Sequence, residues 1–260
     1  MSHPSLPTAL SSAAVSKIKR ITAVDTVRAR ISMAVTLGLL PPGERLPSEA
    51  AIAATLGVGE ITARRAIESL AEEGVLERRR GRAGGTFVAL GGPARAGEAG
   101  ADAIAAYLED SDEVHRLIDV RVLLEAALTH HAALHATSEH LDGLQRHIDA
   151  AASATSWAEF HLADEQFHRG VARSSGLEWA IGYYESVLAD LYAYFLPYPI
   201  AYLRDSNTEH VELLAALRRR DPVTAVRIIE AHVGVLHDSM FMGPRRMRAE
   251  PGSGLDSPTS

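Results

Sequence analysis

Four side chains of the metal-binding type interrupt apolar helical faces in the C-terminal half of the chain. Asp164 and His168 are four residues apart, which places both on the inward face of one helix. His210 and His232 each interrupt the apolar stripe of a later segment, and they lie eleven residues before and after Asp221. Because Asp221-Pro222 is typical of a helix start, we expect an antiparallel hairpin there, with both imidazoles at one level.

These four groups predict a divalent metal site. Buried carboxylate and imidazole groups without partners cost free energy, and one metal ion satisfies all of them together. Imidazole and carboxylate are ligands for Zn, Ni or Mn, and three imidazoles with one carboxylate leave positions open for water or a ligand oxygen. A hydrogen-bonded network of Asp and His without metal is the alternative interpretation.

Two further polar side chains are predicted to contact a small carboxylate bound beside the metal. Arg121 interrupts an apolar stripe, and its guanidinium can bind a carboxylate through two parallel hydrogen bonds. Asn207 precedes His210 by one helical turn on the same face. An ion pair between Arg121 and Glu125, four residues on, is an alternative role for the arginine, and both roles can hold at once.

Residues 46–88 have the pattern of a helix-turn-helix. Ser48 and Glu49 predict the N-terminus of a short helix, and Gly57 predicts its left-handed C-cap. A second helix is predicted from about Glu60 to Glu73. Two short helices joined by a glycine-containing turn form a helix-turn-helix, although this spacing alone also fits an ordinary helical pair. The inward side chains of the second helix are predicted to be Ile61, Ala66, Ile67 and Leu70.

A basic hairpin is predicted directly after these helices. Strands at 75–77 and 86–89 flank a tip that holds four arginines and three glycines. The glycines allow the backbone to approach a phosphate or a narrow groove, and the arginines supply positive charge. The side chains and backbone predicted to contact DNA are Arg45, Ser48, Glu49, Thr62, Arg64, Arg65, Arg82, Gly84 and Gly85.

Charge divides the chain into two parts. The net charge is −7, but residues 1–95 carry 13 basic against 8 acidic residues, whereas residues 96–260 carry 13 against 25. A basic part joined to an acidic part is expected when only one of them meets phosphates. No apolar run reaches membrane-spanning length and the chain has no cysteine, so we expect a bacterial cytoplasmic protein without membrane partners.

The fold class predicted from these patterns is mainly α, with a winged helix-turn-helix followed by an antiparallel helical bundle. Helical periodicity without strand-like alternation continues beyond residue 101. The predicted helices of this half are 101–108, 112–136, 138–152, 156–174, 177–195, 202–219 and 222–242. The predicted organisation is a disordered tail (1–15), a DNA-binding domain (16–90), a flexible linker (91–100), an all-α ligand-binding domain (101–242) and a second disordered tail (243–260).

The N-terminal pattern resembles the GntR family of bacterial transcription regulators. The matching residues are Leu46-Pro47-Ser48-Glu49, Leu56-Gly57-Val58, Thr62, Arg64, Glu73-Gly74, Gly81-Arg82 and Gly84-Gly85-Thr86-Phe87-Val88. The chain departs from the family at Gly59-Glu60, where Ser or Thr followed by Arg is usual, and at Ala50, where Arg is frequent. Glu60 would be repelled by phosphates, so we expect an unusual operator or weaker binding.

The C-terminal pattern is similar to the FCD class (FadR-like) of the same family. The similarity covers roughly residues 110–240 and rests on Asp164-Glu165-Gln166-Phe167-His168, Glu209-His210, Ala231-His232 and Arg121. Gly176 stands where the family often has Asn. The resemblance implies a metal on the Asp and three His positions, an organic or sugar acid beside it, and a homodimer on a palindromic operator.

The leading functional hypothesis is therefore a ligand-responsive transcription regulator, more specifically a repressor of a metabolic operon, and not an enzyme. A metalloenzyme that activates water is the alternative from another class. Glu165 or Glu209 would then be the general base, but each is adjacent in sequence to a metal-site residue and therefore points elsewhere on a helix. A purely structural metal is a third hypothesis, which predicts a closed coordination shell.

Overall fold

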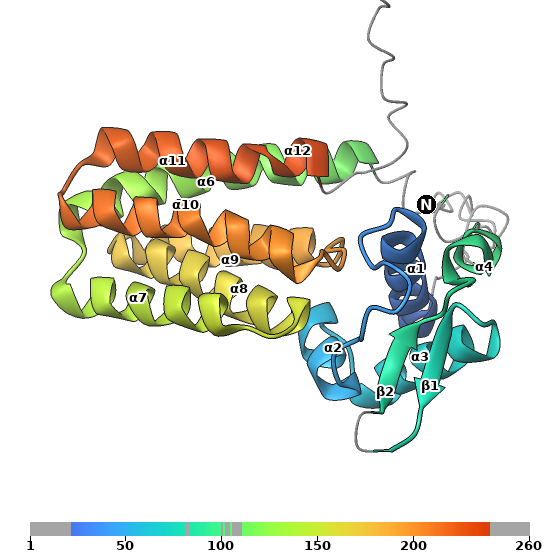
Figure 1. Ribbon diagram of the computed structural model, residues 1–260. Coiled ribbons are helices and arrows are strands. Elements are labelled where there is room, and N and C mark those ends of the chain that lie inside the picture. The colour runs from blue at the N-terminus through green and yellow to red at the C-terminus, as the bar shows by residue number, and fades with distance from the viewer. Residues whose placement is uncertain (1–21, 82–83, 100, 102–104, 106–110, 240–260) are drawn as a thin grey trace, which may run out of the picture.

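The computed structural model describes residues 22–81, 84–99, 101, 105 and 111–239. Within these ranges the chain forms an N-terminal helical domain with a two-stranded hairpin and a C-terminal bundle of long helices (Figure 1). The predicted fold class is thus confirmed. None of the described helices is both long and apolar enough to cross a membrane. Both predicted tails, and Arg82 at the hairpin tip, lie outside the described residues.

The first helices of the N-terminal domain begin and end at the capping residues that the sequence indicates. α1 (Ala23–Thr36) starts at a capping box. α2 (Glu49–Leu56) starts where the Ser48 hydroxyl accepts a hydrogen bond from the amide of Ala51 at 3.2 Å. It ends at Gly57, whose φ of 67° is left-handed and favours glycine.

α3 (Glu60–Glu72) buries the predicted face except at one position. Ala66, Ile67 and Leu70 are buried as expected, but Ile61 is 67% exposed and Ala63 is buried in its place. A helix turns about 100° per residue, so Ala63, rather than Ile61, shares the inward stripe with Ala66, Ile67 and Leu70. Ile61 therefore lies with Glu60 on the outer surface at the start of α3.

The predicted hairpin is present with slightly shifted bounds. β1 (Leu76–Arg79) pairs antiparallel with β2 (Gly85–Val88), and Leu76 lies opposite Val88. A Cβ on Gly84 would lie 2.4 Å from the carbonyl oxygen of Arg79, so this tight turn requires glycine. The hairpin packs beside α3 (Figure 1), which is the arrangement of a winged helix-turn-helix.

Over its described residues, 91–99, the segment 91–100 is not the flexible linker that its composition predicted. Residues Gly92–Ala99 form helix α4, which packs against α1. Ala96 is fully buried, and Pro93 occupies an early helical position where its missing amide hydrogen costs nothing. Burial of the alanine face against α1 therefore outweighs the flexibility that neighbouring glycines would otherwise give.

The C-terminal domain is an antiparallel bundle in which α6 packs against α8, α9 and α11. Its helices are α6 (Ser111–His135), α7 (Ser138–Ser153), α8 (Trp157–Ser174), α9 (Glu178–Tyr192), α10 (Ile200–Arg218), α11 (Pro222–Gly234) and α12 (Leu236–Ser239). The last predicted helix is thus divided at Val235, and the helix predicted at 101–108 lies mostly outside the described residues. The predicted N-cap at Asp221 is confirmed, since its carboxylate accepts from the amide of Thr224.

Candidate functional site

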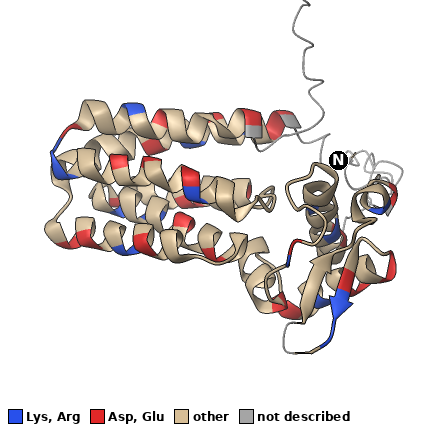
Figure 2. Ribbon diagram, viewed as in Figure 1, with Lys and Arg blue, Asp and Glu red and all other residues tan. Residues whose placement is uncertain are grey.

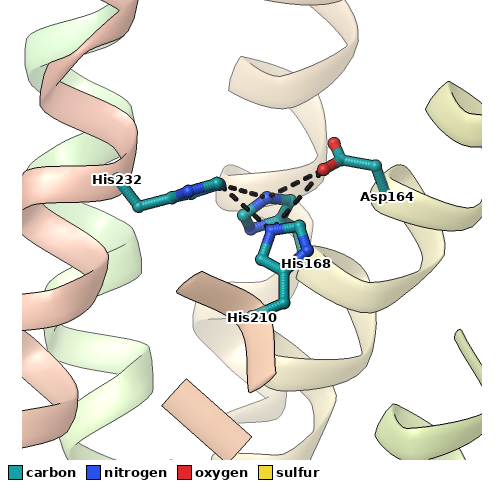
Figure 3. A group of neighbouring side chains, drawn as sticks. All are labelled: Asp164, His168, His210 and His232. Atoms are coloured by element: carbon teal, nitrogen blue, oxygen red, sulfur yellow. Dashed lines mark hydrogen bonds and ion pairs between the residues drawn. The ribbon is translucent and has the colours of Figure 1, made fainter. Parts of the chain in front are cut away.

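The four predicted metal ligands meet inside the bundle. Asp164 and His168 come from α8, His210 from α10 and His232 from α11, and their side chains point toward a common centre (Figure 3). The Nε2 atoms of His210 and His232 are 3.1 Å apart, and those of His232 and His168 are 3.3 Å apart. An Asp164 Oδ1 lies 3.5 Å from His210 Nε2 and 3.7 Å from His168 Nε2. The hairpin around Asp221 does place the two later histidines at one level.

These separations fit a coordinated metal. Ligand atoms about 2.0–2.2 Å from a metal are about 3.0–3.6 Å from their neighbours in tetrahedral or octahedral geometry. Four of the six distances between the ligand atoms are 3.1 to 3.7 Å, and all four atoms lie within 4.8 Å of one another. The residues present therefore fit a metal ion of the Zn, Ni or Mn type.

The outer nitrogen of each imidazole is held by an acceptor. His168 Nδ1 contacts a carboxylate oxygen of Glu125, and His232 Nδ1 lies 2.5 Å from Glu209 Oε2. His210 Nδ1 lies 3.1 Å from the amide oxygen of Asn207. Since these oxygens accept a hydrogen bond from Nδ1–H, they direct the Nε2 lone pairs to the common centre, as in metal sites with orienting outer ligands.

This orientation disfavours a network without metal. Three Nε2 lone pairs that face one another at hydrogen-bond distance repel unless a proton or a cation lies between them. Burial, followed by the neighbouring His232 and His168, holds the pKa of His210 well below its usual range, so an extra proton there is costly. A divalent cation supplies the missing positive charge without protonating any ring.

Arg121 forms the ion pair with Glu125 and also borders the site. Its Nε donates to Glu125 Oε2 at 2.9 Å, and both side chains are buried. Burial opposes ionisation of Glu125, but His168 and Arg121 together hold its pKa below the usual range. Among the described residues the two terminal nitrogens of the guanidinium have no hydrogen-bond partner. Arg121 lines a cavity, so these nitrogens are available to a ligand.

Asn207 does not have the predicted role of contacting the ligand. Its Nδ2 donates to the carbonyl oxygen of Ile148 at 3.1 Å, which fixes the amide so that Oδ1 accepts from His210. Asn207 is absent from the cavity wall because the same face of α10 turns toward α7 at this level. It is a positioning residue for His210.

The cavity next to the metal ligands has a volume of about 300 Å³, at the lower end of the range for small-molecule sites. Its wall contains the metal ligands Asp164, His168 and His232 and several aromatic side chains. The aromatic residues of the wall are Phe160, His161, Tyr192, Phe195, Tyr198 and Tyr202.

Three residues of this site were missed from the sequence. Glu125 was considered only as an ion-pair partner of Arg121, and Glu209 only as a possible base, whereas each orients a histidine. The positions i+4 from Arg121 and next to His210 were the available signals. His161 gave no signal, because one histidine near several apolar residues fits an ordinary core position.

The predicted DNA-binding residues gather at α2, α3 and the hairpin. Arg64 Nε and Arg78 Nη2 both donate to the Glu49 carboxylate at 2.8 Å, so Glu49 orders two arginines. Arg45 donates to the carbonyl oxygen of Gly84 at 3.0 Å and thereby braces the hairpin tip. Arg65 is exposed beside Arg64. Figure 2 shows basic residues on β1, whereas acidic residues are spread over the bundle.

The other predicted contacts have defined local roles in the structure. The Ser48 hydroxyl caps α2. Thr62 is half-buried in the first turn of α3, and Gly85 begins β2 next to Arg45. These residues therefore surround one face of the winged helix-turn-helix, and their contacts with DNA remain predictions.

Replacement of Arg64 by Ala should weaken binding to duplex DNA and flatten its salt dependence. Loss of one phosphate contact reduces the slope of log K against log salt by about 0.9. Fluorescence anisotropy across a salt series measures this slope. Arg146→Ala, an exposed change on α7, is the matched control and should leave the slope unchanged. Equal slopes for Arg64→Ala and the parent protein would refute the predicted phosphate contact of Arg64.

Comparisons with known proteins agree for both halves of the chain. Residues 23–88 match the family described as bacterial regulatory proteins, gntR family, and residues 116–235 match the FCD domain. One relative, from Mycobacterium gastri, is provisionally named HTH-type transcriptional regulator RmpR. It is 32% identical over 87% of this chain and 83% of its own length. The HTH-type transcriptional repressor NanR of Cronobacter sakazakii is 28% identical over 74% of this chain and 75% of its own. A solved GntR structure from Streptococcus agalactiae is 26% identical, with a TM-score of 0.42 over 83% of this chain and 99% of the other.

Proposed function

Because this chain belongs to the GntR family of bacterial regulatory proteins and carries an FCD domain, we propose that it represses a metabolic operon and responds to a small organic acid bound at a metal. Its family consists of DNA-binding transcription regulators, which argues against the metalloenzyme hypothesis. The observation that carries the proposal is one cavity bordered by Arg121 and by three of the four metal ligands.

The metal is proposed to be Zn, Ni or Mn, held by Asp164, His168, His210 and His232. When bound, it supplies a Lewis-acidic position for an oxygen of the ligand. The three oriented imidazoles support this proposal, since all their Nε2 lone pairs converge. Four protein ligands leave a further position open in five- or six-coordinate geometry, which a purely structural, closed site would lack.

A carboxylate is the ligand type that suits this cavity. Arg121 is buried and keeps its charge. Burial lowers the pKa of the guanidinium, but Glu125, Tyr192 and Tyr184 together outweigh burial and raise it. Its terminal nitrogens can donate to one or both carboxylate oxygens while an oxygen of the same ligand reaches the metal. The cavity lies in an acidic domain, so this local positive charge is what would select an anion.

A direct contact between the domains supports a response of DNA binding to the acid. Arg30 of α1 is 2% exposed and donates to the carbonyl oxygens of Phe195 at 2.6 Å and Tyr192 at 2.7 Å. Both residues line the cavity. Thr55 of α2 also donates to the carbonyl oxygen of Ala158 at 3.3 Å. A ligand that moves the cavity wall would therefore displace α1 and α2 relative to the bundle.

A homodimer is proposed as the DNA-binding form. α6 and α9 pack side by side and present largely exposed apolar side chains at Leu123, Trp179 and Tyr183. Exposed aromatic residues of this kind are enriched in protein interfaces, and a two-fold dimer would present two wings to the two half-sites of a palindrome. Reorientation of the domains would then alter the spacing between the wings.

Replacement of Arg121 by Lys tests the acid site. Lysine keeps a charge beside Glu125 but loses the planar fork, so metal content and operator binding should persist. Loss of a charged hydrogen bond worth about 1.5–3 kcal/mol should weaken acid binding about ten- to hundredfold. Calorimetric titration of the metal-loaded protein with benzoate, phenylacetate, lactate and gluconate measures this effect.

Arg169→Lys is the matched control, because Arg169 also pairs with a glutamate four residues away but lies outside the cavity. It should bind the same acids as tightly as the parent protein does. Alanine at position 121 is a poorer test, since it would leave Glu125 buried without its cation. Undiminished acid binding by Arg121→Lys would refute the assigned role of Arg121.

A further inference from the structure

His161 is a second polar residue of the cavity, and neither the metal site nor the carboxylate site uses it. It lies on α8 and is 3% exposed. Its ring stacks on Phe195, with centroids 3.9 Å apart and an interplanar angle of 29°, and meets the edge of Tyr192 at 4.6 Å. These contacts hold the imidazole in one orientation at the cavity wall.

The ring nitrogens of His161 make no hydrogen bond within the described part of the chain, although the residue lines the cavity. Burial lowers the pKa of His161 to about 4, so the neutral ring offers one donor and one acceptor. Polar groups inside a protein normally have a hydrogen-bond partner. An oxygen atom of a ligand in the cavity would supply one for His161.

The position of His161 sets its distance from the metal. On α8 it precedes the metal-site residue His168 by seven residues and Asp164 by three, which corresponds to about 10 Å and about 4.5 Å along the helix axis. The wall also carries the apolar side chains of Phe160, Leu203 and Leu236. The cavity therefore offers a metal and Arg121 for a carboxylate, an apolar surface, and a separate polar group.

We propose that His161 binds a hydroxyl or carbonyl oxygen of the effector away from its carboxylate. This inference rests on the proposed function and specifies its ligand class: a small acid with a mainly apolar body and a second, separate oxygen. The imidazole donates a hydrogen bond to that oxygen or accepts one from it. A polyhydroxylated sugar acid fits less well, since its other hydroxyls would face apolar walls.

Matched pairs of acids test the proposal by calorimetric titration of the metal-loaded, full-length protein. The pairs are phenylacetate with 4-hydroxyphenylacetate and hexanoate with 6-hydroxyhexanoate. In at least one pair the hydroxylated acid should bind at least about tenfold more tightly than its partner without the hydroxyl. A site that hydrogen-bonds a hydroxyl disfavours the analogue that lacks it. This preference should disappear in His161→Phe, which retains a ring to stack on Phe195.

The outcomes separate this inference from the proposed function. If the acids bind in an Arg121-dependent manner but each pair binds equally, or the preference persists in His161→Phe, only the role of His161 is refuted. If no acid binds the metal-loaded protein, the proposed effector site and this inference both fail. A preference that is lost in His161→Phe but retained in Arg169→Lys supports the proposal.

Discussion

Removal of the divalent metal is expected to lower the melting temperature of the C-terminal domain by about 5–10 °C. Metal present at a hundredfold excess over its Kd stabilises the folded state by about 2.7 kcal/mol, and each kcal/mol shifts the melting temperature of a domain of this size by about 2–4 °C. Without the cation, three Nε2 lone pairs again face one another. Thermal unfolding with and without EDTA measures the shift.

Two variants separate loss of metal from loss of packing. His210→Ala removes a ligand but also leaves a cavity in the core. Asp164→Asn removes the carboxylate charge at a partly exposed position and should abolish most of the EDTA-sensitive shift with little packing cost. His130→Ala, an exposed change on α6, should melt and respond like the parent protein. A melting temperature that neither EDTA nor added Zn, Ni or Mn alters would contradict the metal site.

Replacement of Arg30 by Lys is expected to uncouple acid binding from DNA binding. One ammonium group cannot reproduce the guanidinium geometry that bridges the carbonyl oxygens of Tyr192 and Phe195. If the parent protein shows a typical coupling of about 5–150-fold in operator affinity, the variant should fall to about threefold or less. Binding of metal, acid and operator taken singly should persist. Operator affinity with and without saturating acid gives the coupling factor.

Arg28→Lys is the matched control for this change. Arg28 lies on the same helix, but its partners Asp25 and Glu73 belong to its own domain. Linkage is reciprocal, so acid affinity measured with and without operator should change by the same factor in each protein. Full coupling in Arg30→Lys would show that the signal passes elsewhere, for instance through Thr55 and Ala158.

Features with a local cause could be predicted from the sequence. Ser48 and Gly57 delimit α2 because a hydroxyl cap and a left-handed glycine act within one helical turn. Asp164 and His168 share a face through helical periodicity alone. His210 and His232 meet because a hairpin of two helices has a symmetric register about Asp221.

Features that depend on packing between distant segments could not be predicted in this way. Glu125 meets His168 across two helices, and only the assembled bundle brings them into contact. His161 gains its significance from Phe195 and Tyr192, which belong to later segments of the chain. α4 forms where a linker was predicted because Ala96 is buried where α4 packs against α1. The glycine content of a segment indicates backbone freedom, but it does not indicate which surface the segment can pack against.

The central claim is that an acid bound at the metal and Arg121 changes operator affinity. Its most direct measurement is the operator Kd of metal-loaded and EDTA-treated protein, with and without an acid that binds it, at one salt concentration. The operator duplex would be obtained by binding selection from random DNA. We predict that the acid weakens operator binding by metal-loaded protein and has no effect on EDTA-treated protein or on Arg121→Lys at the same acid concentration. An operator Kd that the bound acid leaves unchanged in metal-loaded protein would contradict the account.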